Sequence, residues 1–298
     1  MEDEGTARRQ YREWAAAQAD LPIYFQPGWL SLVGGSDWRA TMTHRADGSV
    51  AVAWPYLPRR RLGLRLVGLP PATPYLGPVF PTGCPPDRTA LPAGVGYAAF
   101  TVHDPRAAWV FGRRCRAMAT QVLDLSVDLP LDSDLRRRLR RGREALRVRE
   151  ATEEADYRAF TRALIARPQA GAPTWPDIFR AAHFLGLARV YLVEDASGRA
   201  HGFAAVPYDS KTGYLTALVR TLDAHPSTAT VLLEHIAVQA RQHNLEVLDL
   251  QSGYLPGVRR FYLRFGARPR WYGLVRLPAN KLYGGLDLLR ATTSSSRL

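Results

Sequence analysis

Asp249 and Gln251, in the stretch LDLQSG, offer a carboxylate and an amide near the end of a strand-like run. Alternate residues of a strand point to the same face, so these two side chains lie on one side. Either that side faces a cleft, where Asp249 is the best carboxylate for a general base, or it faces solvent with Leu248 and Leu250 turned inward. His201, on a central strand, is a second candidate base, although a lone histidine there is also typical of a hydrogen-bonded core residue.

The patterns of several other chemistries are absent from the sequence. No GxGxxG follows a strand, no Walker loop or GxSxG elbow occurs, and the seven histidines form no HExxH pair. The two cysteines, Cys84 and Cys115, lack the spacing of a metal site. The sequence therefore disfavours dinucleotide, P-loop, serine-hydrolase and zinc-peptidase chemistry, and no metal site is predicted.

The chain is strongly basic, with a formal net charge of +13 over 298 residues. Arginine carries nearly all of the positive charge, because Lys211 and Lys281 are the only lysines. A coding bias toward arginine explains this composition. A polyanionic ligand explains it equally well, since one guanidinium pairs with two phosphate oxygens.

Eight arginines lie between Arg136 and Arg149. Most charge runs are solvated faces, and this one is then a helix that bridges two halves of the chain. The alternative is a clamp for phosphates. In that interpretation Arg137, Arg140 and Arg141 contact the substrate.

Length and composition predict two domains, residues 1–130 and 131–298, the second opened by the arginine-rich helix. The hydrophobic fraction of 46% is ample for a core. No run approaches the roughly 20 apolar residues of a membrane span. The amino terminus has no apolar export segment, so a cytoplasmic location is expected.

Periodicity predicts the same order of elements in both halves: a helix, an antiparallel meander, a helical element, and then strand, helix, strand. Asp47-Gly48 supplies the tight turn of a first-half hairpin. In the second half, a helix capped at Asp132, Ser133 or Asp134 carries leucines at helical spacing: Leu135, Leu139 and Leu146. Further helices are expected over 153–167 and 227–244, and a short helix follows Gly253.

This order, with the tail RRFYLRFGA, resembles the GNAT acyltransferase fold, and two such units in tandem are similar to the FemABX-like branch of that superfamily. The resemblance covers about residues 21–277. It implies an α+β fold with two tandem GNAT-like domains, each a mixed, mostly antiparallel sheet flanked by helices. It also implies that the central strands part to admit an extended donor.

In the GNAT family, the loop before the long helix turns glycine-rich backbone N–H groups toward the pyrophosphate of coenzyme A. The matching residues here contain no glycine, and Pro226 removes one donor. FemABX-like enzymes, whose donor is an aminoacyl-tRNA, show the same loss. The resemblance assigns donor-binding candidates to this loop and the preceding strand: Arg220, His225, Ser227, Thr228, Ala229 and Thr230.

Tyr262 matches the family tyrosine that protonates the leaving group, although the preceding part of that motif is replaced by Leu255 and Val258. The alternative is a tyrosine whose ring packs in the core. The resemblance also favours a cleft position for Gln251. Tyr214 and Tyr254 are candidates to line the substrate channel.

The resemblance implies an N-acyltransferase that joins an activated acyl donor to the amine of a small molecule or peptide. Acyl-coenzyme A is the favoured donor, as a co-substrate and not a tightly held cofactor, because related sequences are described as acetyltransferase-like. Aminoacyl-tRNA is the alternative. A third hypothesis is a non-catalytic GNAT-like module that binds RNA or another polyanion, which the missing glycines favour.

Overall fold

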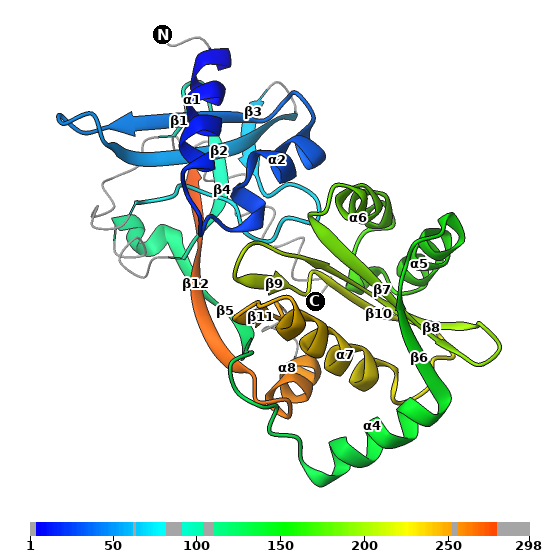
Figure 1. The fold of residues 1–298 in the computed structure, drawn as a ribbon. Coiled ribbons are helices and arrows are strands. Elements are labelled where there is room, and N and C mark those ends of the chain that lie inside the picture. Colours follow the sequence, from blue (N-terminus) through cyan, green and yellow to red (C-terminus); the bar gives the residue numbers. More distant parts are fainter. Residues whose placement is uncertain (1–3, 62–63, 82–90, 104–109, 252–255, 279–298) are drawn as a thin grey trace. The chain divides into compact units, whose positions relative to one another are not determined.

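The computed structural model describes residues 4–61, 64–81, 91–103, 110–251 and 256–278 (Figure 1). The chain divides into two compact units. Unit 1 comprises Met1–Ala17, Gly34–Met118 and Trp271–Leu298, and unit 2 comprises Gln18–Val33 and Ala119–Arg270. Both units are discontinuous in sequence, so their limits differ from a single division at residue 130.

Unit 1 holds a mixed sheet with strand order β1-β2-β3-β4-β12, in which only β3 and β4 are parallel. The bounds are β1 Arg39–His44, β2 Val50–Arg61, β3 Leu64–Gly68, β4 Tyr97–Val102 and β12 Arg268–Pro278. The helical elements are α1 Glu4–Ala16, α2 Pro27–Gly34, which begins in unit 2, and η2 Gly112–Arg114. The predicted turn at Asp47 joins β1 to β2, and Gly48 has the positive φ of 81° that this turn requires.

The core of unit 1 contains Trp54 and Phe100, whose ring centroids are 4.9 Å apart. Val275, near the end of the chain, is fully buried beside them. Its strand β12 pairs with β4 over Gly273–Pro278. This pairing explains why the last strand belongs to the first unit.

Unit 2 contains two groups of hydrogen-bonded strands, in the orders β5-β11-β9 and β10-β8-β7-β6. The bounds are β5 Cys115–Asp124, β6 Leu146–Glu150, β7 Ala188–Asp195, β8 Ala200–Pro207, β9 Thr212–Tyr214, β10 Ala217–Arg220 and β11 Val247–Asp249. The helical elements are η1 Ile23–Phe25, α4 Ser133–Ala145, α5 Glu154–Ala166, η3 Pro168–Ala170, α6 Trp175–Phe184, α7 Thr228–Gln242 and α8 Pro256–Leu263. Helices cover both faces of the four-stranded group: Phe203 of β8 stacks on Phe160 of α5, while a Cβ at the adjacent Gly202 would lie 2.8 Å from Thr228 of α7.

The sheet of unit 2 parts in its middle, as predicted. The chain from β9 to β10 first pairs with β11 in parallel and then with β8 in antiparallel. The change of partner falls between Leu215, whose N–H donates to the carbonyl of Asp249, and Thr216, whose N–H donates to the carbonyl of Ala205. Beyond this point the two strand groups no longer share backbone hydrogen bonds among the described residues.

The arginine-rich helix α4 is shorter than its leucine spacing predicts. It starts at the cap residue Asp132, which accepts a hydrogen bond from the N–H of Leu135, and it ends at Ala145. Leu146 opens strand β6, which pairs with β7 and is buried by tertiary contacts that the helical period does not encode. The sequence interpretation also missed α6, whose ring contacts include Trp175 with Phe179 at 6.1 Å.

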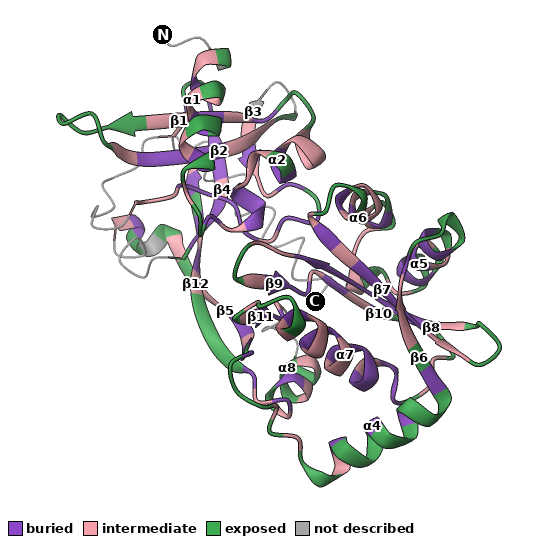
Figure 2. Ribbon diagram, in the orientation of Figure 1, coloured by how far each residue is buried: buried purple, intermediate pink, exposed green. Residues whose placement is uncertain are grey.

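Figure 2 shows that β7 and β8 are largely buried, whereas much of α4 is exposed. Mixed sheets flanked by helices confirm the predicted α+β fold. In unit 2 the core joins Leu123, Leu248, Leu250 and Phe265 to the inner face of α7. Of the helices in the described part of the chain, none combines the length and apolar character needed to cross a bilayer.

Arg264 ties the start of α4 to the turn after α8, and we predict that this contribution depends on pH. Its guanidinium lies 2.9 Å from Asp132 and 2.8 Å from Asp134. These contacts, with that of Arg137, lower the pKa of Asp134 from 3.8 to about 2. A carboxyl group whose pKa is lower in the folded state than in the unfolded state stabilises the fold at pH values above its unfolded-state pKa. This stabilisation is lost as the pH falls through the folded-state pKa.

Arg264→Gln should therefore lower the melting temperature at neutral pH, and its difference from wild type should narrow between about pH 4 and pH 2. Scanning calorimetry over this range measures the effect. Arg270→Gln, an exposed neighbour, is the matched control and should shift melting little at any pH. An Arg264→Gln difference that stays constant down to pH 2 would contradict the assignment.

Candidate functional site

Asp249 is buried on the face of β11 opposite the core leucines. Leu248 and Leu250 belong to the hydrophobic core, and Asp249 is 2% exposed. Its Oδ1 accepts a hydrogen bond from Thr120 Oγ1 at 2.5 Å and from the backbone N–H of Gln251 at 2.9 Å. The carboxylate therefore fixes the backbone where the chain leaves β11.

Tyr24 bridges the two diverging segments of the parted sheet. Its hydroxyl lies 2.6 Å from Thr216 Oγ1, on the segment leading to β10, and 3.0 Å from Gln251 Nε2, on the segment leaving β11. Gln251 has a φ of 56°, a left-handed conformation that is uncommon for a residue other than glycine. Residues held in this way cluster at functional sites, and the parting point is therefore our candidate site.

Tyr214 and Asp209 extend this cluster along β9. The Tyr214 hydroxyl donates to Asp209 Oδ2 at 2.7 Å, and its ring centroid lies 5.0 Å from that of Tyr24. The same carboxylate oxygen accepts the N–H of Ile23 at 3.3 Å, which holds η1 against the strand. Tyr214, predicted to line the channel, is therefore brought together with Gln251 and Asp249 through Tyr24.

Sequence reasoning missed Tyr24. Tyr24 lies in the stretch LPIYFQPGWLSLV, whose apolar residues predict a helix packed on the core, and nothing in this stretch marks the tyrosine as functional. Its position depends on a contact across about two hundred residues of chain, because Gln251 and Thr216 are both remote in sequence. No local pattern encodes such a pairing.

The protonation states of the Tyr24 and Tyr214 hydroxyls limit the reactions that this cluster can assist. Burial raises the pKa of Tyr24 far above the ordinary value of 10.0, against smaller opposing effects of its bonds to Thr216 and Gln251. Burial and the nearby Asp209 charge likewise raise the pKa of Tyr214. Both phenols remain protonated at neutral pH, so they cannot act as bases, and the Tyr214 proton is committed to Asp209.

His201 lies away from this cluster and both of its ring nitrogens are engaged. Nε2 is 3.1 Å from Asp195 Oδ2, and Nδ1 accepts the backbone N–H of His225 at 3.1 Å. Accepting at Nδ1 places the neutral ring's proton on Nε2. The geometry gives His201 a structural role in holding the loop before α7, in line with the core alternative for this residue.

Two backbone N–H groups of the loop that leads into α7 are bonded within the loop. His225 Nδ1 accepts the N–H of Ser227 at 3.2 Å, and the His225 carbonyl accepts the N–H of Thr228 at 3.0 Å. Ser227, Thr228 and Thr230 are buried, whereas Ala229 is half-buried.

Helix α4 covers this first turn of α7. A Cβ on Gly142 would lie 2.9 Å from Ser227 Cβ, so the two backbones are in close contact. The hydroxyl of Thr228 is fully buried and has no hydrogen-bond partner among the described residues. Arg220, at the exposed end of β10, accepts a bond from Arg167 Nε through its carbonyl.

Tyr262 is 4% exposed, and its ring belongs to the core of unit 2, 5.7 Å from that of Phe261. This placement gives Tyr262 a packing role, and an acid role for it stays a prediction. Tyr254, the other aromatic candidate in this region, lies outside the described residues.

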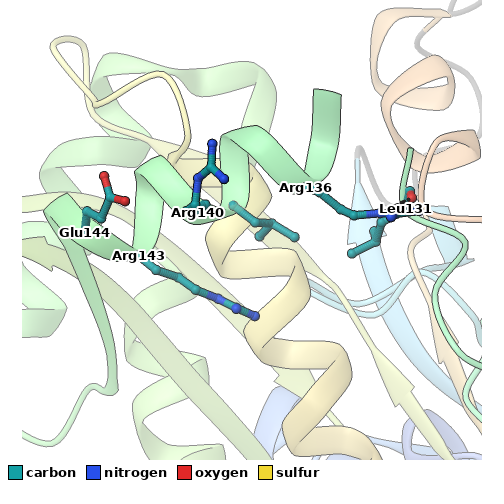
Figure 3. Close-up of a pocket in the computed structure, with 6 residues that line it drawn as sticks. Leu131, Arg136, Arg140, Arg143 and Glu144 are labelled. Carbon is teal, nitrogen blue, oxygen red and sulfur yellow. Dashed lines mark hydrogen bonds between the residues drawn. The ribbon is translucent and has the colours of Figure 1, made fainter. Parts of the chain in front are cut away.

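The arginines of α4 fall into two groups. Arg137 and Arg138 pair with Asp134 at 2.8 and 3.0 Å. Three others line an open depression of about 530 Å³ together with Leu131, Leu139 and Glu144: Arg136, Arg140 and Arg143. Figure 3 shows Arg143 extending toward α7, where it pairs with Glu234 at 2.7 Å.

The predicted phosphate contacts are therefore not equivalent. Arg140 lines the depression and has no ion-pair partner in the described part of the chain. Arg141 is exposed, but it is not among the residues that line the depression. Arg137 is committed to Asp134.

Solved structures identify the fold. FemX matches with a TM-score of 0.64 at 9% identity, over 90% of this chain and 96% of that one. The C-terminal domain of a proposed lysylphosphatidylglycerol synthetase from Agrobacterium fabrum matches at 0.60 and 17% identity, over 97% of both chains. A tandem GNAT protein of clavulanic acid biosynthesis matches at 0.54 and 12% identity, over 93% and 94%.

The chain has the tandem GNAT fold. No protein-family model and no curated protein matches the sequence, so the likeness rests on structure. It confirms the predicted FemABX-like architecture. At these identities it establishes the fold and leaves the substrates to chemical argument.

We predict that Tyr24→Phe lowers both the stability of the protein and its transferase turnover, because the bridging hydroxyl is lost. Gln251 Nε2 would lose its bond to Tyr24, and a buried group without its partner costs about 1–3 kcal/mol. Tyr157→Phe is the matched control, because its buried hydroxyl also makes a structural bond, to the carbonyl of Ala151 six residues earlier at 3.0 Å.

Urea denaturation should show comparable losses of stability in the two variants. Transferase turnover, measured well below both melting temperatures, should fall only in Tyr24→Phe. Equal turnover in the two variants would remove Tyr24 from the site.

Proposed function

We propose that the protein is an aminoacyltransferase that moves an aminoacyl group from an aminoacyl-tRNA to an amine acceptor. The proposal rests on one observation above the others, the state of the loop before α7. Coenzyme A needs backbone N–H groups that are open to its pyrophosphate. Here the N–H groups of Ser227 and Thr228 are bonded within the loop, and α4 packs over the turn.

Helix α4 supplies an alternative phosphate-binding surface. Arg136, Arg140 and Arg143 recur at spacings of four and three residues, so they share one helix face. Because Arg143 is paired with Glu234, we assign the phosphate contacts to Arg136 and Arg140. Arginines on a helix face contact successive phosphates of a nucleic acid without reading its sequence. This arrangement supports a polyanionic donor larger than a nucleotide cofactor.

The structural neighbours are consistent with this choice. FemX carries the name of the FemABX-like branch, in which the loop glycines are also lost. The name of the Agrobacterium domain denotes the joining of lysine to phosphatidylglycerol, a transfer of an aminoacyl group. Neither name fixes the acceptor of this chain.

The candidate site can assist such a transfer through hydrogen bonding. The acceptor nitrogen bonds to the donor carbonyl carbon, the carbon–oxygen bond to the tRNA ribose breaks, and one proton passes from nitrogen to the departing oxygen. In this proposal the second N–H of the Gln251 amide, which Tyr24 holds through the first, stabilises the oxyanion. Asp249 positions Gln251 through its backbone N–H and accepts the amine proton.

The test is direct measurement of transfer. Purified protein is incubated with radiolabelled aminoacyl-tRNA or acetyl-coenzyme A, in each case with a panel of amines, and product is counted. Labelled amide from aminoacyl-tRNA alone supports the proposal. Product from acetyl-coenzyme A alone would replace it with acyl-coenzyme A chemistry, and salt-sensitive tRNA binding without any turnover would favour the non-catalytic RNA-binding module.

We predict that Arg136→Gln with Arg140→Gln weakens tRNA binding through lost phosphate contacts. The slope of log affinity against log salt should fall by about 1.5, at roughly 0.7–0.9 per contact. Filter binding at several salt concentrations measures the slope.

The matched control is Arg158→Gln with Arg162→Gln on α5, which removes the same charge elsewhere in unit 2. Its slope should stay close to that of wild type. Equal reductions in both double variants would show that net charge, and not the α4 face, sets the affinity.

A further inference from the structure

A small cavity lies on the α7 side of the four-stranded group of unit 2. Its volume is about 230 Å³, and its apolar lining comes from Val206, Ile236, Ala240 and Leu245. These residues belong to β8, to the C-terminal half of α7 and to the turn after it. Protein interiors are close-packed, so a space of this size between a helix and its sheet is an exception.

The polar part of the lining is contributed by β7, by the turn after β8 and by the end of α7. Arg189, Tyr191, Tyr208 and His243 bring a guanidinium, two phenols and an imidazole to one space. An apolar floor with a few convergent polar groups is the general form of a small-molecule site. None of these side chains belongs to the Tyr24 cluster.

The cavity offers donors and few acceptors. Asp209 lines it, but its Oδ1 already accepts the N–H groups of Lys211 and Thr212, at 2.9 and 2.8 Å, and its Oδ2 accepts two further donors. The Ser210 hydroxyl is committed to the carbonyl of Ala19 at 2.9 Å.

Donor groups remain available. Arg189 has five N–H groups and uses some of them to bind Glu150 and the Tyr191 hydroxyl, and the Tyr208 hydroxyl has no hydrogen-bond partner among the described residues. Donors that converge on a space without matching acceptors favour an anionic ligand.

The size and local charge narrow the class of anion. The single guanidinium is already paired with Glu150, and Asp209 adds a second negative charge nearby, so a doubly charged phosphate is disfavoured. A planar carboxylate matches the fork of Arg189. The α7 carbonyls near the cavity do not oppose it, because those of Gln239 and Ala240 accept the N–H groups of His243 and Leu245.

We infer that this cavity is a binding site for a small monocarboxylate with an apolar body, with the carboxylate on Arg189 and Tyr208 and the body over Ala240. Its lining shares no residue with the α4 face, and it shares with the Tyr24 cluster only Asp209, whose carboxylate oxygens already accept bonds from Lys211, Thr212, Ile23 and Tyr214. It therefore goes beyond the proposed transfer reaction and does not depend on the identity of the donor.

The test is calorimetric titration of the whole chain with 3-phenylpropionate and with its neutral isostere, 3-phenylpropionamide. Wild-type protein should bind the acid at least about tenfold more tightly than the amide, a difference typical of one charge-assisted contact. Ala240→Leu fills the floor and should abolish binding of both. Gln242→Leu, on the exposed side of the same helix, should leave binding unchanged.

The double variant Arg189→Gln with Glu150→Gln removes both partners of the ion pair. It should bind 3-phenylpropionate no more tightly than 3-phenylpropionamide. Tyr208→Phe, which keeps the ring, should weaken the acid only. Equal binding of acid and amide to wild type would overturn the anionic assignment. Absence of binding to wild type, or binding that survives Ala240→Leu in a folded variant, would overturn the site.

Discussion

The hydroxyl of Tyr24 bonds to two strand segments at the point where they stop bonding to each other. Thr216 continues toward β8 and Gln251 leaves β11, and the sheet is held open in a defined way because one buried phenol contacts both. A sheet that simply frayed would leave unpaired backbone groups without a fixed geometry. The opening is therefore a specified structure with its own hydrogen bonds.

Helix α4 has a buried face that packs on the core and an exposed face that carries arginines. Leu135, Leu139 and Gly142 are buried, and Gly142 allows the helix to approach the first turn of α7. The outer face carries the arginines, some neutralised by Asp134 and others exposed. The same helix thus packs on the first turn of α7 through one face and presents exposed arginines on the other.

The sequence was informative where structure is local. The cap at Asp132, the Asp47-Gly48 turn and the long helix α7 follow from short-range rules, and the order of elements was sufficient to predict the fold. The shared strand face predicted for Asp249 and Gln251 does not apply, because β11 ends at Asp249 and Gln251 has a left-handed φ of 56°. Leu146 was assigned to a helix since its spacing from Leu139 fits one, while pairing with β7 decided its conformation.

The discontinuity of the two units has a consequence for biosynthesis. Unit 1 lacks its strand β12 until residues 271–278 have been made, and unit 2 combines the early segment Gln18–Val33 with Ala119–Arg270. Domains usually fold in order as they emerge. Here the early segment of unit 2 must wait for residues 119–270, and unit 1 must wait for β12, so unit 1 cannot be completed before unit 2 has been synthesised.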